Sequence, residues 1–299
     1  MINETGQIIF LNIIIISAIY LLLTAIKLLR SRHLYKSSIK HEILKGIRNG
    51  EFYVHYQPVF ETNSGSCCGA EALIRWRRVD GKSVPPSIFI PEAEKEGIII
   101  QLTQHLFSLI ADDLKEWEIS APFHLGVNIS GAHLIDEKFT TDIVNFFETL
   151  DDSFKLVLEI TEHSAVQKTE LVYQRLNALR HKGCYVAIDD FGTGYSSLGL
   201  LQTLPVDYLK IDKMFIDCVR LENMDTDILE CIISLCKKLG IDAIAEGVSD
   251  DYQADWLKSQ QVNYTQGFYY SRPKNALNFI EWYYDFNKNI NFRSVMQSK

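Results

Sequence analysis

Two adjacent carboxylates, Asp189 and Asp190, follow a short apolar run that is typical of a buried strand, Cys184 to Ile188. A turn containing Gly192 and Gly194 comes directly after them. Adjacent carboxylates raise each other's pKa unless a cation lies between them. The acid pair therefore predicts either a cation site or, more simply, a helix cap at Asp190.

Polar side chains also end several other apolar runs of the sequence. These residues are Glu71, Asn128, Glu159, Glu162, Lys210, Glu246 and Gln266. Each one alone could be a cap or a surface ion pair. Together they offer carboxylate and amide oxygens without histidine or cysteine, a set that suits Mg²⁺ or Mn²⁺ rather than zinc. A site with this many oxygens favours two-metal phosphoester hydrolysis, in which cations about 3.5 to 4 Å apart activate water and stabilise the leaving oxygen.

Composition and spacing exclude other classes of function. The turn Gly192-Thr193-Gly194 lacks the third glycine of a dinucleotide-binding fingerprint, and the acid pair before it would repel a pyrophosphate. The net charge of -8 argues against direct binding to nucleic-acid polymers, although a local basic pocket for a small phosphate ligand stays open. The 6 cysteines contain no C-x-x-C pair, which indicates reduced structural residues.

Short apolar runs alternate with helical patterns over residues 51–287, and this rhythm predicts one domain. The expected strands are Phe52 to Phe60, Cys68 to Trp76, Phe123 to Ile129, Lys155 to Ile160, Cys184 to Asp189, Tyr208 to Ile211, Ala243 to Ala245 and Val262 to Tyr269. The clearest helices are Gln101 to Trp117, Ala132 to Leu150, Thr169 to Lys182, Met224 to Leu239 and Asp251 to Ser259.

We expect an α/β fold, a (β/α)8 TIM-like barrel, with a doubly wound open sheet as the alternative. In a barrel the carboxyl ends of the strands meet at one face, which would gather the polar residues. A polar tail, residues 288–299, follows.

The N-terminal region predicts a membrane anchor. Residues 8–29 are almost wholly apolar, and about 20 residues with a rise of about 1.5 Å each can span a bilayer as one transmembrane helix. Basic residues follow the span rather than precede it, which predicts an N-terminus outside and a cytoplasmic location for the domain that follows. A cleaved signal peptide is disfavoured because no basic region precedes the span. Residues 30–50 are expected to form a juxtamembrane helix or linker.

Several motifs resemble those of the EAL-domain family of cyclic di-GMP phosphodiesterases. They are YQPV at Tyr56 to Val59, EALIRW at Glu71 to Trp76, FIPEAEKEG, VNIS, EITE, DDFGTGYSS, LKID, AEGV and QGF, and they extend from about Ile43 to Asn287. The resemblance implies a modified TIM barrel that forms a homodimer. It also implies hydrolysis of cyclic di-GMP to linear 5′-pGpG with Mg²⁺ or Mn²⁺, inhibition by Ca²⁺, and a role in bacterial biofilm and motility signalling.

The resemblance assigns a role to each matching residue. One metal would take Glu71, Asn128, Glu159 and Asp189, and the second would take Asp189 as a bridge, Asp190 and Glu246. Lys210 would lie beside the hydrolytic water, with Gln266 nearby, and the substrate would contact Gln57, Arg75 and Asp212. Glu162 would hold the loop Phe191 to Ser197 near the dimer contact. The alternative is a receptor or partner-docking module that binds cyclic di-GMP without cutting it, but degenerate relatives of that kind usually lack a metal acid, and this sequence keeps all of them.

Overall fold

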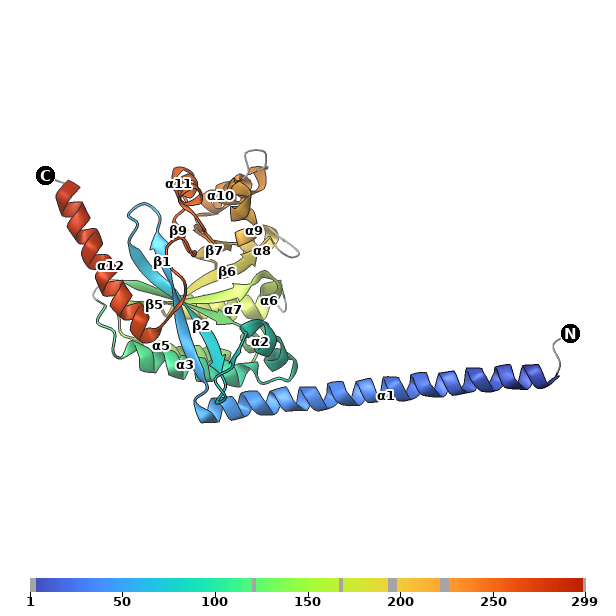
Figure 1. Ribbon diagram of the computed structural model, residues 1–299. Coiled ribbons are helices and arrows are strands. Elements are labelled where there is room, and N and C mark those ends of the chain that lie inside the picture. The colour runs from blue at the N-terminus through green and yellow to red at the C-terminus, as the bar shows by residue number, and fades with distance from the viewer. Residues whose placement is uncertain (1–3, 120–121, 167–168, 193–197, 221–225, 298–299) are drawn as a thin grey trace.

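The computed structural model describes residues 4–119, 122–166, 169–192, 198–220 and 226–297 (Figure 1). At 4–11, 28–38, 166, 169, 198, 200, 220 and 289–297 it describes the backbone alone. Residues 193–197 of the predicted glycine turn and Met224, the expected start of a helix, lie outside the described residues.

The strands close into a barrel in the order β1, β9, β8, β7, β6, β5, β4, β2 and back to β1. Their bounds are β1 Phe52–Glu61, β2 Cys67–Arg77, β4 Phe123–Ile129, β5 Phe154–Thr161, β6 Tyr185–Phe191, β7 Tyr208–Ile211, β8 Asp242–Ala245 and β9 Tyr264–Thr265. Two short strands, β3 (Ser83–Val84) and β10 (Lys274–Asn275), pair with β2 and β1. The predicted barrel is confirmed, and the open sheet is excluded because β1 and β2 join the two ends of the ring.

One strand departs from a uniformly parallel barrel. β1 pairs antiparallel with both β2 and β9, whereas β2 and the strands from β4 to β9 run parallel to one another. The link between β1 and β2 is only residues 62–66. A parallel crossover needs roughly a dozen residues or more, so this short link forces a hairpin.

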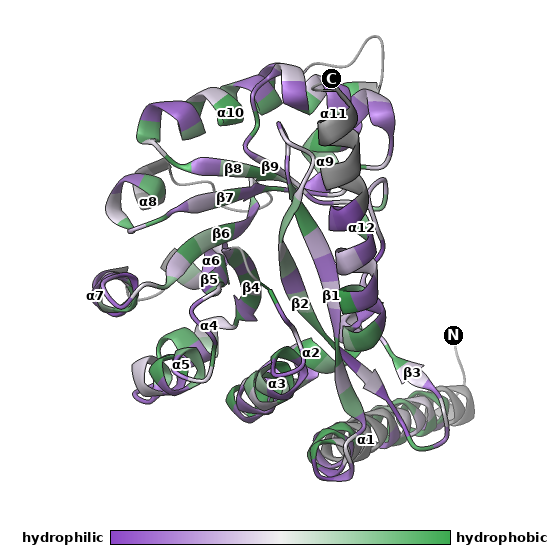
Figure 2. Cartoon of the chain, turned by 90° about the vertical axis from the view of Figure 1, so that its left-hand side faces the viewer, coloured by the Kyte–Doolittle hydropathy of each residue, from purple (hydrophilic) through white to green (hydrophobic). Residues whose placement is uncertain are grey.

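Helices surround the barrel on its outside (Figure 2). Their bounds are α1 Glu4–Asn49, α2 Pro86–Lys95, α3 Ile99–Leu114, α4 Gly131–Leu134, α5 Phe139–Phe147, α6 Glu162–Val166, α7 Thr169–Arg180, α8 Leu198–Thr203, α9 Lys213–Ile216, α10 Asp227–Leu239, α11 Asp251–Ser259 and α12 Ala276–Gln297, with a 3₁₀ turn at Asp217–Arg220. The predicted helix over 132–150 is two helices, because Asp136 accepts a hydrogen bond from the Lys138 amide between them. The backbone expected as a polar tail continues α12 to Gln297.

The barrel interior is layered. Residues at every second position of β4, namely His124, Gly126 and Asn128, face inward, as the strand period requires. His124 packs against Tyr185, Tyr208 and Tyr264 at the amino ends of the strands, with ring centroids 5.8, 5.9 and 6.3 Å away. A layer that contains Val157, Ala187 and Ile244 lies above these rings. This apolar filling supports the polar residues at the opposite end.

Helix α1 is continuous from Glu4 to Asn49 and projects away from the barrel (Figure 1). The predicted anchor, 8–29, and the predicted juxtamembrane helix, 30–50, are therefore parts of one element. Within the residues that the structure describes, no helix has an apolar stretch long enough to cross a membrane. The predicted anchor extends beyond the described side chains at both of its ends.

The last turns of α1 dock on the barrel beside α2. Ile39 and Ile43 are buried there, at 5% and 0% exposure. The Lys40 ammonium donates to the Glu96 carbonyl oxygen at 2.9 Å, just after the carboxyl end of α2, and Arg78 of the β2–β3 turn pairs with Glu42. These contacts fix the junction between α1 and the barrel.

Candidate functional site

The carboxyl ends of the parallel strands gather the predicted acids around one buried lysine. Lys210, on the four-residue strand β7, is 1% exposed. Its ammonium nitrogen lies 2.7 Å from Glu159, 2.9 Å from Glu246, 3.2 Å from Asp189 and 3.5 Å from Glu71. The acids belong to β5, β6, β2 and the residue after β8, so barrel closure is what brings them together.

Two amides fix the carboxylate of Glu71. Asn128 donates to one oxygen at 2.7 Å, and Gln266 donates to the other at 2.9 Å. Burial raises the pKa of Glu71, but the Lys210 charge and these hydrogen bonds outweigh it, so the net pKa is below the ordinary value. Glu71 is therefore held as a carboxylate. Asn128 contacts it through the side-chain nitrogen, so the side-chain oxygen of Asn128 can bind another partner.

Three other acids of the cluster, Glu159, Glu246 and Asp190, resist ionisation. Burial raises the pKa of Glu159 well above its ordinary value, and repulsion from Glu71 and Asp189 adds to the effect. The pKa of Glu246 rises to about 8 for the same reasons. Burial and the neighbouring Asp189 and Asp212 raise the pKa of Asp190. Lys210 supplies less positive charge than these acids need in order to ionise together. Bound cations would therefore stabilise their ionised forms.

A bulge in β6 turns both aspartates of the pair toward the site. Successive residues of a regular strand point to opposite faces, but the pairing of β6 with β7 shifts register between Ile188 and Phe191. Asp190 there has a φ of 53°, in the left-handed region. As a result one oxygen each of Asp189, Asp190 and Glu246 lie within 4.8 Å of one another. The predicted set for the second metal is thus assembled.

The donor set fits hard divalent cations. Glu71, Glu159, Asp189, Asp190 and Glu246 with Lys210 carry four net negative charges when all are ionised, the charge that two divalent cations would balance. In the described structure, Glu71, Glu159 and Asp189 of the predicted first metal site converge on the Lys210 ammonium. Asn128 joins them through Glu71.

The predicted substrate residues lie at the same mouth. Gln57 of β1 is paired with Glu71 of β2. Arg75 is half-buried four residues further along β2, and burial lowers its pKa. Asp212 accepts a hydrogen bond from the Met214 amide at 2.7 Å and so caps the amino end of α9. Glu162, 5% exposed, begins α6, but residues 193–197 of the loop it was predicted to hold lie outside the described part of the chain.

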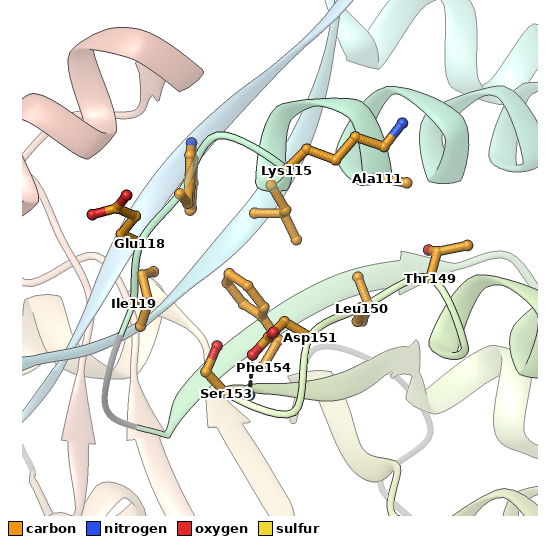
Figure 3. A pocket seen from close by; sticks show the side chains of 11 residues that line it. Ala111, Lys115, Glu118, Ile119, Thr149, Leu150, Asp151, Ser153 and Phe154 are labelled. Atoms are coloured by element: carbon orange, nitrogen blue, oxygen red, sulfur yellow. Dashed lines mark hydrogen bonds between the residues drawn. The ribbon is translucent and has the colours of Figure 1, made fainter.

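Two pockets of the structure differ in whether predicted site residues line them. A cavity of about 250 Å³ has Arg75 and Asn128 on its wall and apolar side chains of α2 and α3 around it. A wider groove of about 800 Å³ lies at the other end of the barrel, where α3 and the turn before β5 meet at Trp117, Leu150 and Phe154 (Figure 3). The wider groove contains none of the predicted site residues.

The sequence patterns missed one residue of this mouth. Gly126 lies in the interior of β4, directly against the side chain of Glu159. The available signal was a glycine inside a strand pattern, which marks a close approach of another group.

Comparison with known proteins gives consistent matches. The model of the EAL domain family matches residues 40–273. The probable cyclic di-GMP phosphodiesterase PdeG of Escherichia coli K12 is 37% identical over 280 residues, which cover 92% of this chain and 54% of that protein. The probable cyclic di-GMP phosphodiesterase PdeN of the same organism is 41% identical over 244 residues, 81% of this chain and 47% of that protein. The chain spans about half the length of these two relatives.

A solved structure described as the PaMucR phosphodiesterase in complex with c-di-GMP has a similar fold. Its TM-score to this chain is 0.75 at 30% identity, covering 81% of this chain and 99% of that one.

Proposed function

Because the chain belongs to the EAL domain family, we propose that it hydrolyses cyclic di-GMP to linear 5′-pGpG with the help of divalent cations, and so lowers this messenger in bacterial signalling. The observation that carries the proposal is the convergence of Glu71, Glu159, Asp189 and Glu246 on one barrel mouth, with the Asp190 carboxylate beside them. The similarity to named cyclic di-GMP phosphodiesterases gives the substrate.

The reaction is the addition of water to one 3′,5′-phosphodiester. A new bond forms between phosphorus and the water oxygen in line with the bond that breaks, and the 3′ oxygen leaves and takes up a proton. Mg²⁺ or Mn²⁺ bound by the five carboxylates and Asn128 would supply an activated water and charge stabilisation for the phosphoryl oxygens and the leaving oxygen.

Other side chains at the mouth would bind the substrate or hold the acids in place. Arg75 provides a planar guanidinium that suits a phosphate. The 250 Å³ cavity lined by Arg75 and Asn128, with its apolar wall, suits a flat base. Gln57 and Asp212 complete the substrate contacts. Lys210 keeps the acids close together and balances part of their charge, and Gln266 orients Glu71.

Hydrolysis by the full chain tests the proposal, with release of linear 5′-pGpG measured by chromatography in Mg²⁺, Mn²⁺ and Ca²⁺. We expect product with Mg²⁺ or Mn²⁺ and none with Ca²⁺. The Asp189→Asn variant removes a carboxylate proposed to serve both cations, so its rate should fall by at least about a hundredfold while its circular dichroism is unchanged. A wild-type chain that binds cyclic di-GMP but yields no product would instead be a receptor.

We further propose that the protein is a homodimer through its barrel and that α1 holds it at the inner membrane, with the N-terminus outside and the barrel in the cytoplasm. Support for the anchor comes from large apolar side chains that α1 leaves exposed: Ile16, Tyr20 and Leu21 are 66%, 69% and 68% exposed. The basic residues that follow the apolar segment set the orientation.

A further inference from the structure

Strand β4 carries a glycine directly beneath the acid cluster. Gly126 is paired with Glu71 of β2 on one side and with Val157 of β5 on the other. A glycine inside a strand costs backbone entropy and leaves a gap in side-chain packing. Its φ is negative, so no unusual backbone conformation accounts for it. Another feature of this position must favour glycine.

That feature is the carboxylate of Glu159. A Cβ atom added to Gly126 would lie 2.1 Å from Oε1 of Glu159 and 3.0 Å from its Cδ. The carboxylate thus rests against the backbone of β4, in the space that any other residue would fill. In the same pose its second oxygen, Oε2, accepts a hydrogen bond from Lys210 at 2.7 Å.

Glu159 has little room to move elsewhere. It is 5% exposed, and Glu71 and Asp189 lie near it as repelling charges. The cavity behind it, bounded by His124, Tyr208 and others, is only about 30 Å³, the space of a single water. A methyl group at position 126 would therefore push the carboxylate off β4 and change its distance from Lys210.

We propose that Gly126 is a positioning residue: its missing side chain sets the Glu159 carboxylate in the place from which it contacts Lys210 and from which it would share a cation with Glu71 and Asn128. The cation part rests on the proposed function. Gly69 and Gly267 differ in kind, because a Cβ there would meet backbone oxygens, of His124 at 2.4 Å and of Val248 at 2.1 Å. Their role is in the fold, whereas the conflict at Gly126 is with one functional side chain.

A stability cycle on the full chain tests the contact without any metal. Thermal unfolding in EDTA is compared for the wild type, Gly126→Ala, Glu159→Ala and the double variant. Gly126→Ala should lower the Tm in the wild-type background and leave it unchanged or higher in the Glu159→Ala background, because the methyl group then has space. If Gly126→Ala fails to fold, a folded double variant supports the proposal. An equal loss of Tm in both backgrounds, or a double variant that also fails to fold, overturns it.

Manganese binding tests the positioning role. By calorimetry, Gly126→Ala should bind Mn²⁺ at least about tenfold more weakly than the wild type, the usual scale for residues that orient a metal ligand. Gly199→Ala is the matched control, since a Cβ there meets none of the described atoms within 4 Å, and its affinity should equal the wild type's. Wild-type affinity in Gly126→Ala overturns the proposal. A wild-type chain that binds no Mn²⁺ overturns the proposed function instead, and the stability cycle then decides the role of Gly126 alone.

Discussion

Lys210 lies among four carboxylates and is 1% exposed, so bulk solvent screens its charge only weakly. Burial lowers the pKa of the ammonium, but the surrounding acids outweigh burial and raise it well above the ordinary value. The lysine is therefore a permanent cation. Replacement by a neutral residue would leave acids buried without compensation, which is among the costly changes in a protein.

The raised pKa of Glu246 predicts a pH-dependent stability. The pKa of Glu246 is about 8 in the folded state and 4.5 in the unfolded state. Between pH 4.5 and pH 8, Glu246 is therefore protonated in the folded protein and ionised in the unfolded protein. This contribution is complete below about pH 4.5 and is lost as the pH rises toward 8. In EDTA, the Tm should therefore fall between pH 5 and pH 8, as measured by differential scanning calorimetry.

Glu246→Gln gives the control for this effect, because the amide does not titrate. The variant should show a smaller fall in Tm over the same range, with a remainder from Glu159, whose pKa is also raised. An identical fall in both proteins would contradict the assignment.

Residue types at strand ends were enough to predict the acids of this site. Asp189 and Glu159 lie near the carboxyl ends of β6 and β5, as the strand-end pattern expected, because a barrel brings these ends to one face. Glu71 joins the same cluster but lies in the interior of β2, which continues to Arg77. The pattern could not show that Asn128 and Gln266 donate to Glu71, since these partners are 57 and 195 residues away from it. Nor could it show the contact at Gly126, which depends on one rotamer of Glu159.

At the scale of elements, the docking of α1 is decided by a few apolar side chains. Ile43 is fully buried between α1 and the barrel. Ile43→Ala should lower the free energy of unfolding by about 2 to 5 kcal/mol, the usual cost of such a cavity. Urea denaturation followed by fluorescence measures this change.

Ile88→Ala on α2 is the matched control, because Ile88 is 47% exposed. It should change the free energy of unfolding by no more than about 0.5 kcal/mol. Equal effects of the two substitutions would show that the α1 junction is not packed as described.

Element boundaries followed the sequence where hydrophobic runs and turns coincide. β4, β7 and α11 have the predicted limits. The run Val262 to Tyr269 supplies only a two-residue strand, because the chain turns at Gly267, which lies against the Val248 backbone. Neither the β6 bulge nor the direction of β1 could be read locally, since both depend on pairing between strands.

At the scale of the whole molecule, α1 makes the protein asymmetric, with a long apolar arm on one side of the barrel. If this arm is a membrane anchor, the full chain expressed in bacteria should sediment with membranes, resist carbonate extraction and enter solution only with detergent. Cysteine-accessibility labelling near residue 5 should report an exposed outer position. Recovery of the full chain in the soluble fraction after lysis would contradict the anchor.

The reversed direction of β1 has a consequence for how this barrel is connected to anything placed before it. In a barrel with all strands parallel, the chain would enter at the amino ends, opposite the catalytic mouth. Here Phe52, at the start of β1, is paired with Trp76, near the carboxyl end of β2, so the chain arrives on the side of the acid cluster. A module fused before β1 would therefore lie on the same side of the barrel as the acid cluster, whereas the groove of Figure 3 lies at the opposite end.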